Sequence, residues 1–267
     1  MQISYSKQSR LIGSSMDELS IQKWEDYFEL LGKKEKDWKD NQSAKSLAQY
    51  ICGEGKFVNR NGVHEMKCML GEVLNSDNIN LDLSQAEYKV AFDNYNHKRE
   101  HDIGIIGTCN ERKLFVGVEA KVDETFGKTV KQALAGISKN SNMENRVDGL
   151  KHLFKIPKEV DISEYRYQLF YALAGCLPFK DYKENEIPSD GIYVCLFLTL
   201  HMLDLKPTKR SPKTRYEKNH DDLMSFLELF DKKEIIKSKS MDKIKFSAYK
   251  ISSTRGNITV IEAHVYP

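Results

Sequence analysis

The stretch HDIGIIGTCNERKLFVGVEAKV, residues 101–122, decides how this chain folds. Asp102–Thr108 and Leu114–Val122 are rich in β-branched and apolar side chains, which is typical of buried strands. Asn110-Glu111-Arg112 between them is a polar turn, and strands joined by so short a turn form an antiparallel hairpin most simply. The hairpin predicts that residue 102 lies roughly opposite residue 119.

The flanking segments predict helices on both sides of this hairpin and further strands. Helices are expected around 24–31, from Ser43 as N-cap to 52, over 64–74, and from Thr129, from Asp161 and through 223–230; strands are expected over 88–92, Ile192–Leu200 at the sheet centre, Ile244–Ile251 and Ile258–Val265. This order indicates an α/β fold with a mixed central sheet flanked by helices. We expect residues 1–80 to form a helical region packed on a core of residues 81–267 with a C-terminal extension, as one structural unit.

Composition narrows the class of protein. The 267 residues are 40% hydrophobic and 30% charged with a net charge of +2, which supports a buried core and excludes both global disorder and a uniformly basic protein. The longest apolar run, Ile192–Leu200, is about half the ~20 residues of a membrane span, and Met1–Lys7 lacks the apolar region of a signal peptide. The five cysteines are scattered without a Cys-x-x-Cys motif, so a reduced, cytoplasmic protein is expected.

Two carboxylates and a lysine are expected to meet at the end of the hairpin. Glu119 and Lys121 lie two residues apart on one strand, so both side chains leave the same face, ~7 Å apart along the backbone. With Asp102 opposite and the carbonyl of Ala120 nearby, they make a hard oxygen site suited to Mg²⁺, with Mn²⁺ as the alternative. Such an ion activates water and polarises a phosphoryl oxygen, while the lysine orients the water. This set of groups is typical of phosphodiester hydrolysis.

Two alternatives stay open at this stage. A Glu-x-Lys pair on a strand is often a solvated surface pair, which would make this a structural or regulatory protein. The fold could also bind nucleic acid or a protein partner without catalysis. Charged side chains on an otherwise apolar strand are costly unless they are used, which favours the catalytic interpretation.

Asp102 followed by Glu119-Ala120-Lys121 resembles the PD-(D/E)xK nuclease superfamily, whose members share the restriction-endonuclease-like fold. The longer run Val118–Gly127 resembles an uncharacterised bacterial branch of it, as do Arg166–Leu169 and Trp38–Ala48, over roughly residues 38–230. The resemblance implies a metal-dependent DNA endonuclease, with restriction or defence as its setting. The cutting of both DNA strands would favour a homodimer.

The same resemblance assigns roles to individual residues. It implies that Asp102 and Glu119 are metal ligands, that Lys121 is the catalytic lysine, and that Gln168, with Arg166, projects toward the site from a helix. His101 stands where the superfamily usually has proline. The helix over 44–52 lacks the acidic residue of many relatives, for which Glu65 and Glu72 are the candidates; Asp123 and Glu124 are either outer-shell groups or exposed turn residues.

Basic residues and histidines supply the remaining signals. The loop Lys206–Lys218 carries Lys209, Arg210, Lys213 and Arg215, which would contact the phosphates of a DNA substrate or lie in a solvated loop. The basic run Lys232–Lys245 indicates a solvated helix face. The seven histidines show no spacing typical of metal ligands, so structural or surface roles are expected for them, except for His101, which adjoins Asp102 and is a candidate to face the site.

Overall fold

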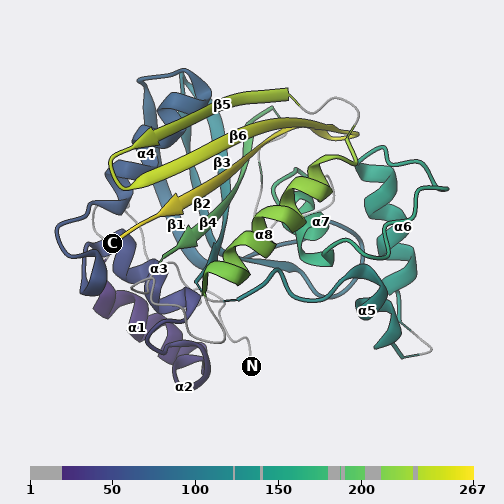
Figure 1. Cartoon of the computed structure of the whole chain (residues 1–267), viewed down its shortest axis with the longest axis horizontal. Helices are drawn as coiled ribbons and strands as arrows, with labels where there is room; N and C mark the ends of the chain where they lie inside the picture. Colours follow the sequence, from purple (N-terminus) through teal and green to yellow (C-terminus); the bar gives the residue numbers. More distant parts are fainter. Residues whose placement is uncertain are drawn as a thin grey trace, which may run out of the picture.

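A mixed seven-stranded sheet runs through the molecule (Figure 1). The computed structural model describes residues 20–122, 124–138, 141–179, 187, 190–201, 212–230 and 234–267. The strand order is β1-β2-β3-β4-β7-β6-β5, and the strands are β1 (Ile79–Val90), β2 (Arg99–Cys109), β3 (Arg112–Lys121), β4 (Ile192–Leu200), β5 (Glu234–Met241), β6 (Ile244–Ser253) and β7 (Gly256–Val265). The β3–β4 and β4–β7 pairs are parallel and the others antiparallel. The predicted α/β class with a mixed central sheet flanked by helices is confirmed.

The helices form two groups that follow the chain (Figure 1). The first group is α1 (Ile21–Leu30), α2 (Lys34–Asp37), α3 (Ser43–Cys52), the 3₁₀-helix η3 (Gly55–Phe57) and α4 (Gly62–Leu74); the second is α5 (Val130–Ala135), α6 (Met143–Leu153), α7 (Tyr167–Ala174) and α8 (Pro212–Leu227). Val116 and Val118 pack in the core of the first group, whereas Phe115 packs with α7 and α8. Because side chains alternate along a strand, each face of β3 thus has its own core.

Local signals explain where the N-terminal helices begin and end. Ser20 caps α1 by accepting from the Lys23 amide, and Gly53 ends α3 in the left-handed region with φ 68°. The N-cap of α3 is Gln42 rather than the predicted Ser43, whose hydroxyl donates to Glu124 instead. The serine is thereby turned toward the strand end that carries the candidate site.

The hairpin of β2 and β3 forms as predicted. Asn110 and Glu111 at its turn have φ of 48° and 66°, which suits the tight turn that matches strand twist. The ladder pairs Cys109 with Arg112 at the turn and Ile103 with Val118 at the far end, so position 102 falls opposite position 119.

β4 occupies the sheet centre over the predicted residues, because its run of apolar side chains suits a strand buried on both faces. Other boundaries differ from expectation. β1 begins at Ile79, well before residue 88, and the run predicted as a helix face over Lys232–Lys245 contains edge strand β5. Lysines on that edge are compatible with a strand because they discourage further pairing.

The helical expectations downstream also need correction. Asp161 caps a turn through the Ser163 amide, while α7 begins only at Tyr167. α8 begins at Pro212, so the later part of the expected basic loop is helical. All five cysteines are free. None of the helices in the described part of the chain has the length and apolar character needed to cross a bilayer.

Substitutions of two glycines test how closely β1 packs on β2. A Cβ on Gly107 of β2 would lie 2.0 Å from the Asn80 carbonyl oxygen of β1, whereas a Cβ on Gly149 of α6 would meet nothing within 4 Å. We expect Gly107→Ala to lower the free energy of unfolding by about 1–3 kcal/mol. Gly149→Ala should raise it by about 0.5–1 kcal/mol, because alanine favours the helix. Urea unfolding measures both, and equal effects would contradict the register of β1 on β2.

Candidate active site

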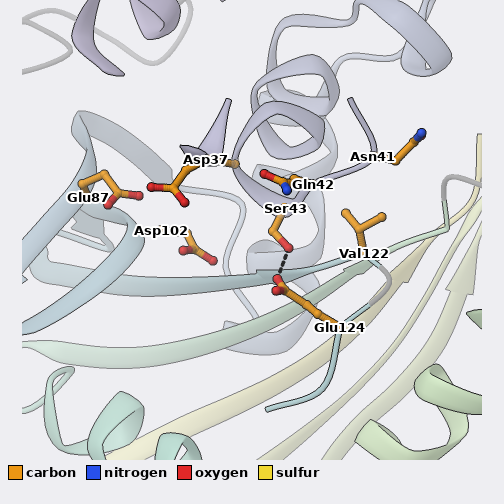
Figure 2. A pocket seen from close by; sticks show the side chains of 9 residues that line it. Asp37, Asn41, Gln42, Ser43, Glu87, Asp102, Val122 and Glu124 are labelled. Carbon is orange, nitrogen blue, oxygen red and sulfur yellow. Dashed lines mark hydrogen bonds between the residues drawn. The ribbon is translucent and has the colours of Figure 1, made fainter. Parts of the chain in front are cut away.

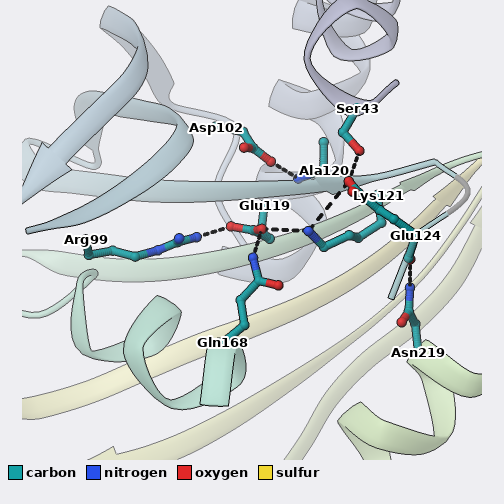
Figure 3. Close-up of polar contacts among 9 residues, drawn as sticks. All are labelled: Ser43, Arg99, Asp102, Glu119, Ala120, Lys121, Glu124, Gln168 and Asn219. Carbon is teal, nitrogen blue, oxygen red and sulfur yellow. Dashed lines mark hydrogen bonds and ion pairs between the residues drawn. The ribbon is translucent and has the colours of Figure 1, made fainter. Parts of the chain in front are cut away.

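Glu119 of β3 is a buried carboxylate held by three donors from three elements (Figure 3). Its Oε2 accepts from Arg99 of β2, and its Oε1 accepts from Gln168 of α7 and from Lys121 Nζ at 2.9 Å. Glu119 is only 2% exposed and Lys121 only 7%. An isolated buried carboxylate is very costly, so the ion pairs with Arg99 and Lys121 are what compensate Glu119 in this position.

The partners of Glu119 are themselves positioned by α7. The Arg99 guanidinium lies over the Tyr171 ring at 4.7 Å, and Gln168 belongs to the first turn of the helix. Arg166, at the N-cap, donates to the Gly127 carbonyl at 2.6 Å and to Asp222 of α8 at 2.7 Å. The structure therefore places Gln168 against Glu119, whereas Arg166 anchors the start of the helix.

Asp102 of β2 lies against the backbone of β3. Its Oδ2 accepts from the Ala120 amide at 2.7 Å, just beyond Ile103–Val118, the last pair of the ladder. The amide and carbonyl of one strand residue point to the same side, so the Ala120 carbonyl also faces β2. Asp102 thus sits beside the backbone that joins Glu119 to Lys121, with a carbonyl oxygen on the same side.

The regular alternation of side chains between the two faces of the sheet is interrupted at Asp102. Ile103 packs in the core beneath α3 and α4, yet Arg99 and His101, which lie an even number of residues earlier, approach Gly175 at the end of α7. On β1, Glu87 has φ 53° and falls between Ala86 and Tyr88, the partners of Ile103 and His101. This break in alternation directs Asp102 and Glu87 to a cavity rather than into either core.

The cavity has a volume of about 500 Å³ and carries acidic side chains (Figure 2). Its lining comes from β1, β2, the loop after β3, the end of α2, the loop before α3 and the start of α3, namely Asp37, Asn41, Gln42, Ser43, Ala44, Glu87, Asp102, Val122 and Glu124. Four of these residues are Asp or Glu and none is Lys or Arg. Such a concentration of carboxylates attracts cations.

Glu124 joins this cavity to the lysine of the site. Its side chain is 51% exposed, yet its Oε1 lies 3.7 Å from Lys121 Nζ and accepts from Ser43, while Asn219 of α8 donates to its backbone carbonyl at 2.9 Å. Glu124 is thus an exposed residue that also contacts Lys121 and borders the cavity. Asp123 lies outside the described residues.

Burial sets the electrostatics of the acidic groups. It raises the pKa of Asp102 above the ordinary value, while Lys121, the Ala120 amide and Arg99 act in the opposite direction. Burial also raises the pKa of Glu87, whose carboxylate pairs with Lys33. Both groups are harder to ionise than in water, so a bound cation would interact favourably with them.

Other residues singled out in the sequence lie elsewhere. His101 is fully buried against Phe115, and its ring nitrogens have no hydrogen-bond partner among the residues that the structure describes. Glu65 and Glu72, the candidates for an additional acidic residue on a helix, do not line the cavity beside Asp102. Glu65 pairs with Arg60, and Glu72 pairs with Lys237 and Lys239 of β5. Lys209 and Arg210 lie outside the described residues; Lys213 and Arg215 belong to α8, where Arg215 is half-buried.

Arg99 and Glu87 are parts of the site that the sequence analysis missed. Arg99 precedes Asp102 by three residues, so simple alternation would place it on the opposite face. Glu87 could have been found only with the full extent of β1, including its left-handed backbone at that residue.

Substitution of Arg99 tests whether Glu119 is ionised and held by two cations. Arg99→Met should lower the free energy of unfolding by about 3 kcal/mol, because it leaves the buried carboxylate with Lys121 as its remaining cation. Arg112→Met, at the exposed start of β3, is the matched control and should change stability by less than about 0.5 kcal/mol. Chemical denaturation measures both, and a loss of similar size in the two variants would contradict the ion pair.

The raised pKa of Asp102 predicts that this residue lowers the stability of the fold at neutral pH and no longer does so in acid. Its folded-state pKa is raised above the unfolded-state value, so its charge destabilises the fold at neutral pH, and this destabilisation is relieved as the pH falls through the folded-state pKa. Asp102→Asn keeps an oxygen for the Ala120 amide without the charge. We therefore expect a higher Tm than wild type at pH 7 in EDTA, with the difference shrinking in acid. Asp26→Asn, on the exposed side of α1, should show no such gain.

Comparison with known proteins places the chain in a family. Residues 20–255 match the family described as Domain of unknown function (DUF6946), a match that begins just before α1 and ends at the turn between β6 and β7. No curated protein and no solved structure matches the chain. Because the family match covers far more than half of the sequence, the chain belongs to the DUF6946 family.

Proposed function

We propose that this protein is a metal-dependent nuclease that hydrolyses phosphodiester bonds in DNA. The observation that carries the proposal is the position of Asp102, which lies against the Ala120 backbone between Glu119 and Lys121 and lines an acidic cavity. The resemblance to PD-(D/E)xK nucleases also supports Asp102 and Glu119 as metal ligands and Lys121 as the catalytic lysine. A role in restriction or defence rests on that resemblance alone, and the cutting of both strands would bring two copies together.

The proposed cation would be held by oxygen atoms, which are the ligands that a hard divalent ion favours. Asp102 and the Ala120 carbonyl face the same side, and Glu119 can add one oxygen. A bound Mg²⁺ or Mn²⁺ would polarise a phosphoryl oxygen and make a bound water more acidic. The fit requires Glu119 to release a donor, and Oε1, which Lys121 and Gln168 share, is the oxygen that can do so.

The protein groups around the carboxylates have separable tasks. Arg99 holds the Oε2 side of Glu119 from within the core, which keeps the other oxygen directed toward the strand end. Lys121 Nζ lies between Glu119 at 2.9 Å and Glu124 at 3.7 Å, so it can turn from one acceptor to another. In the proposed reaction the ammonium orients the attacking water and balances charge on the phosphate. Gln168 positions Glu119.

A second candidate is a catalytically inactive member of the same fold that binds nucleic acid or a protein partner. The observation in its favour is that Arg99, Lys121 and Gln168 already satisfy both oxygens of Glu119 without an ion. Such a protein would keep the ionic cluster as a structural element only. Binding that is lost at high salt, without cleavage under any divalent ion, would favour this candidate.

Cleavage assays with matched variants distinguish the two candidates. With plasmid, linear duplex and single-stranded DNA, and RNA for comparison, we expect wild-type cleavage of DNA in Mg²⁺ or Mn²⁺ and none in EDTA. Lys121→Met and Asp102→Asn should each lower the rate at least about 100-fold. Each removes one charge with little change of shape.

Lys113→Met is the control for this assay, because Lys113 is an exposed lysine near the turn end of the same strand. Its cleavage rate should match that of wild type, and circular dichroism should show all variants folded. Undiminished cleavage by both site variants would reject the site. No cleavage by folded wild type in any divalent ion would reject the nuclease proposal.

A further inference from the structure

A second cluster of metal-ligating side chains lies apart from the candidate active site. His220 of α8 approaches the carboxylate of Glu262 on β7, with its Nδ1 2.9 and 3.0 Å from the two oxygens. His264, two residues further along β7, places its Nε2 3.4 Å from Glu262 Oε1. One ligand atom from each residue lies within 4.8 Å of the other two.

Strand register shows where this cluster lies relative to Glu119 and Lys121. Glu119 pairs with Phe197 of β4, which pairs with Glu262; Lys121 pairs with Thr199, which pairs with His264. Partners in parallel strands share a face of the sheet. The cluster is therefore on the same face and at the same level as Glu119 and Lys121, two strands or roughly 10 Å away. That separation is too large for two ions that share one phosphate, which lie about 3.5–4 Å apart.

Glu262 is a buried carboxylate that lies beside two histidines. Glu262 and His264 are 6% and 7% exposed. Among the described residues, the charged groups within ion-pair distance of Glu262 are His220 and His264. A buried carboxylate is costly unless cations or hydrogen-bond donors compensate it, and a bound dication beside the two imidazoles would do so.

Room for a ligand exists on the open side of the cluster. The His220 side chain is 43% exposed, and with Glu262 and His264 it borders a cavity of about 390 Å³. The other groups that face this cavity are Tyr216, Ser238, Lys239, Ser240, Lys245, Phe246 and Ser247. The rings of Tyr216 and His201 pack against His264 with centroids 4.6 and 5.6 Å away, so the histidine is held in place.

We propose that His220, Glu262 and His264 bind one divalent transition-metal ion of the zinc class. Two imidazole nitrogens and one carboxylate oxygen are a ligand set that such ions favour, whereas Mg²⁺ favours oxygen ligands. The fourth coordination position opens to the cavity. Because His220 is on a helix 42 residues from Glu262, no sequence motif reveals the site.

The ion would clamp α8 to the sheet next to the candidate active site. Residues beside His220 on α8 already contact that site: Asn219 donates to the Glu124 carbonyl, and Asp222 accepts from Arg166 at the start of α7. Fixing His220 to β7 therefore also fixes the helix that holds these two contacts. The metal site does not depend on whether the neighbouring site is catalytic.

Metal titration of the full chain tests the proposal. Co²⁺ is followed by its visible absorption and Zn²⁺ by the shift in Tm, both in excess Mg²⁺ so that the oxygen site near Asp102 does not compete. We expect one equivalent to bind to wild type, with a Tm increase of about 5–10 °C at a hundredfold excess over Kd. His220→Ala should weaken binding more than about 100-fold, because even outer-shell changes cost about 10–100-fold.

Two further variants keep the test specific. His220 is partly exposed, so its removal should leave the protein folded in the absence of metal. His152→Ala removes an exposed histidine from the last turn of α6 and should bind like wild type, as should Asp102→Asn. Equal binding by wild type and His220→Ala, or no stoichiometric binding by wild type, would overturn the proposal.

Discussion

The carboxylate of Glu119, buried between a strand and a helix and paired with Arg99 and Lys121, is the constraint on which this end of the molecule depends. Its three donors come from β2, β3 and α7, so the carboxylate ties the hairpin to the helix that covers it. A buried charge of this kind stabilises a fold little compared with packed hydrocarbon. Its presence in the middle of an apolar sheet therefore fits a functional demand better than a structural one.

The sequence determines the framework around this carboxylate quite directly. A hairpin with a two-residue left-handed turn has a fixed register, so the position of residue 102 opposite 119 could be derived from the turn alone. β4 was equally accessible, because a short apolar run with β-branched and aromatic residues is typical of a strand covered on both faces. In each case the decisive interaction is local or comes from burial alone.

The remaining parts depend on contacts between distant segments. The interrupted alternation at Asp102 goes with the left-handed backbone of Glu87 on the neighbouring strand β1. The polar residues of β1 make most of this strand hard to recognise in the sequence. β5 has the composition of a solvated helix, and it is a strand because β6 offers it a free edge. The cluster of His220, Glu262 and His264 joins a helix to a strand across 42 residues, so it has no periodicity to detect. Tertiary packing decides all three.

Parallel pairing explains why so much polar chemistry gathers at one end of the sheet. β3, β4 and β7 run in the same direction and in register, so their carboxyl ends meet at one edge. Lys121 and His264 stand in the same row there, with Glu119 and Glu262 one row before. In open α/β sheets, ligands bind outside the carboxyl ends of the strands. The apolar residues earlier in these strands build the core, and the polar residues lie at their carboxyl ends, where ligands bind in sheets of this kind.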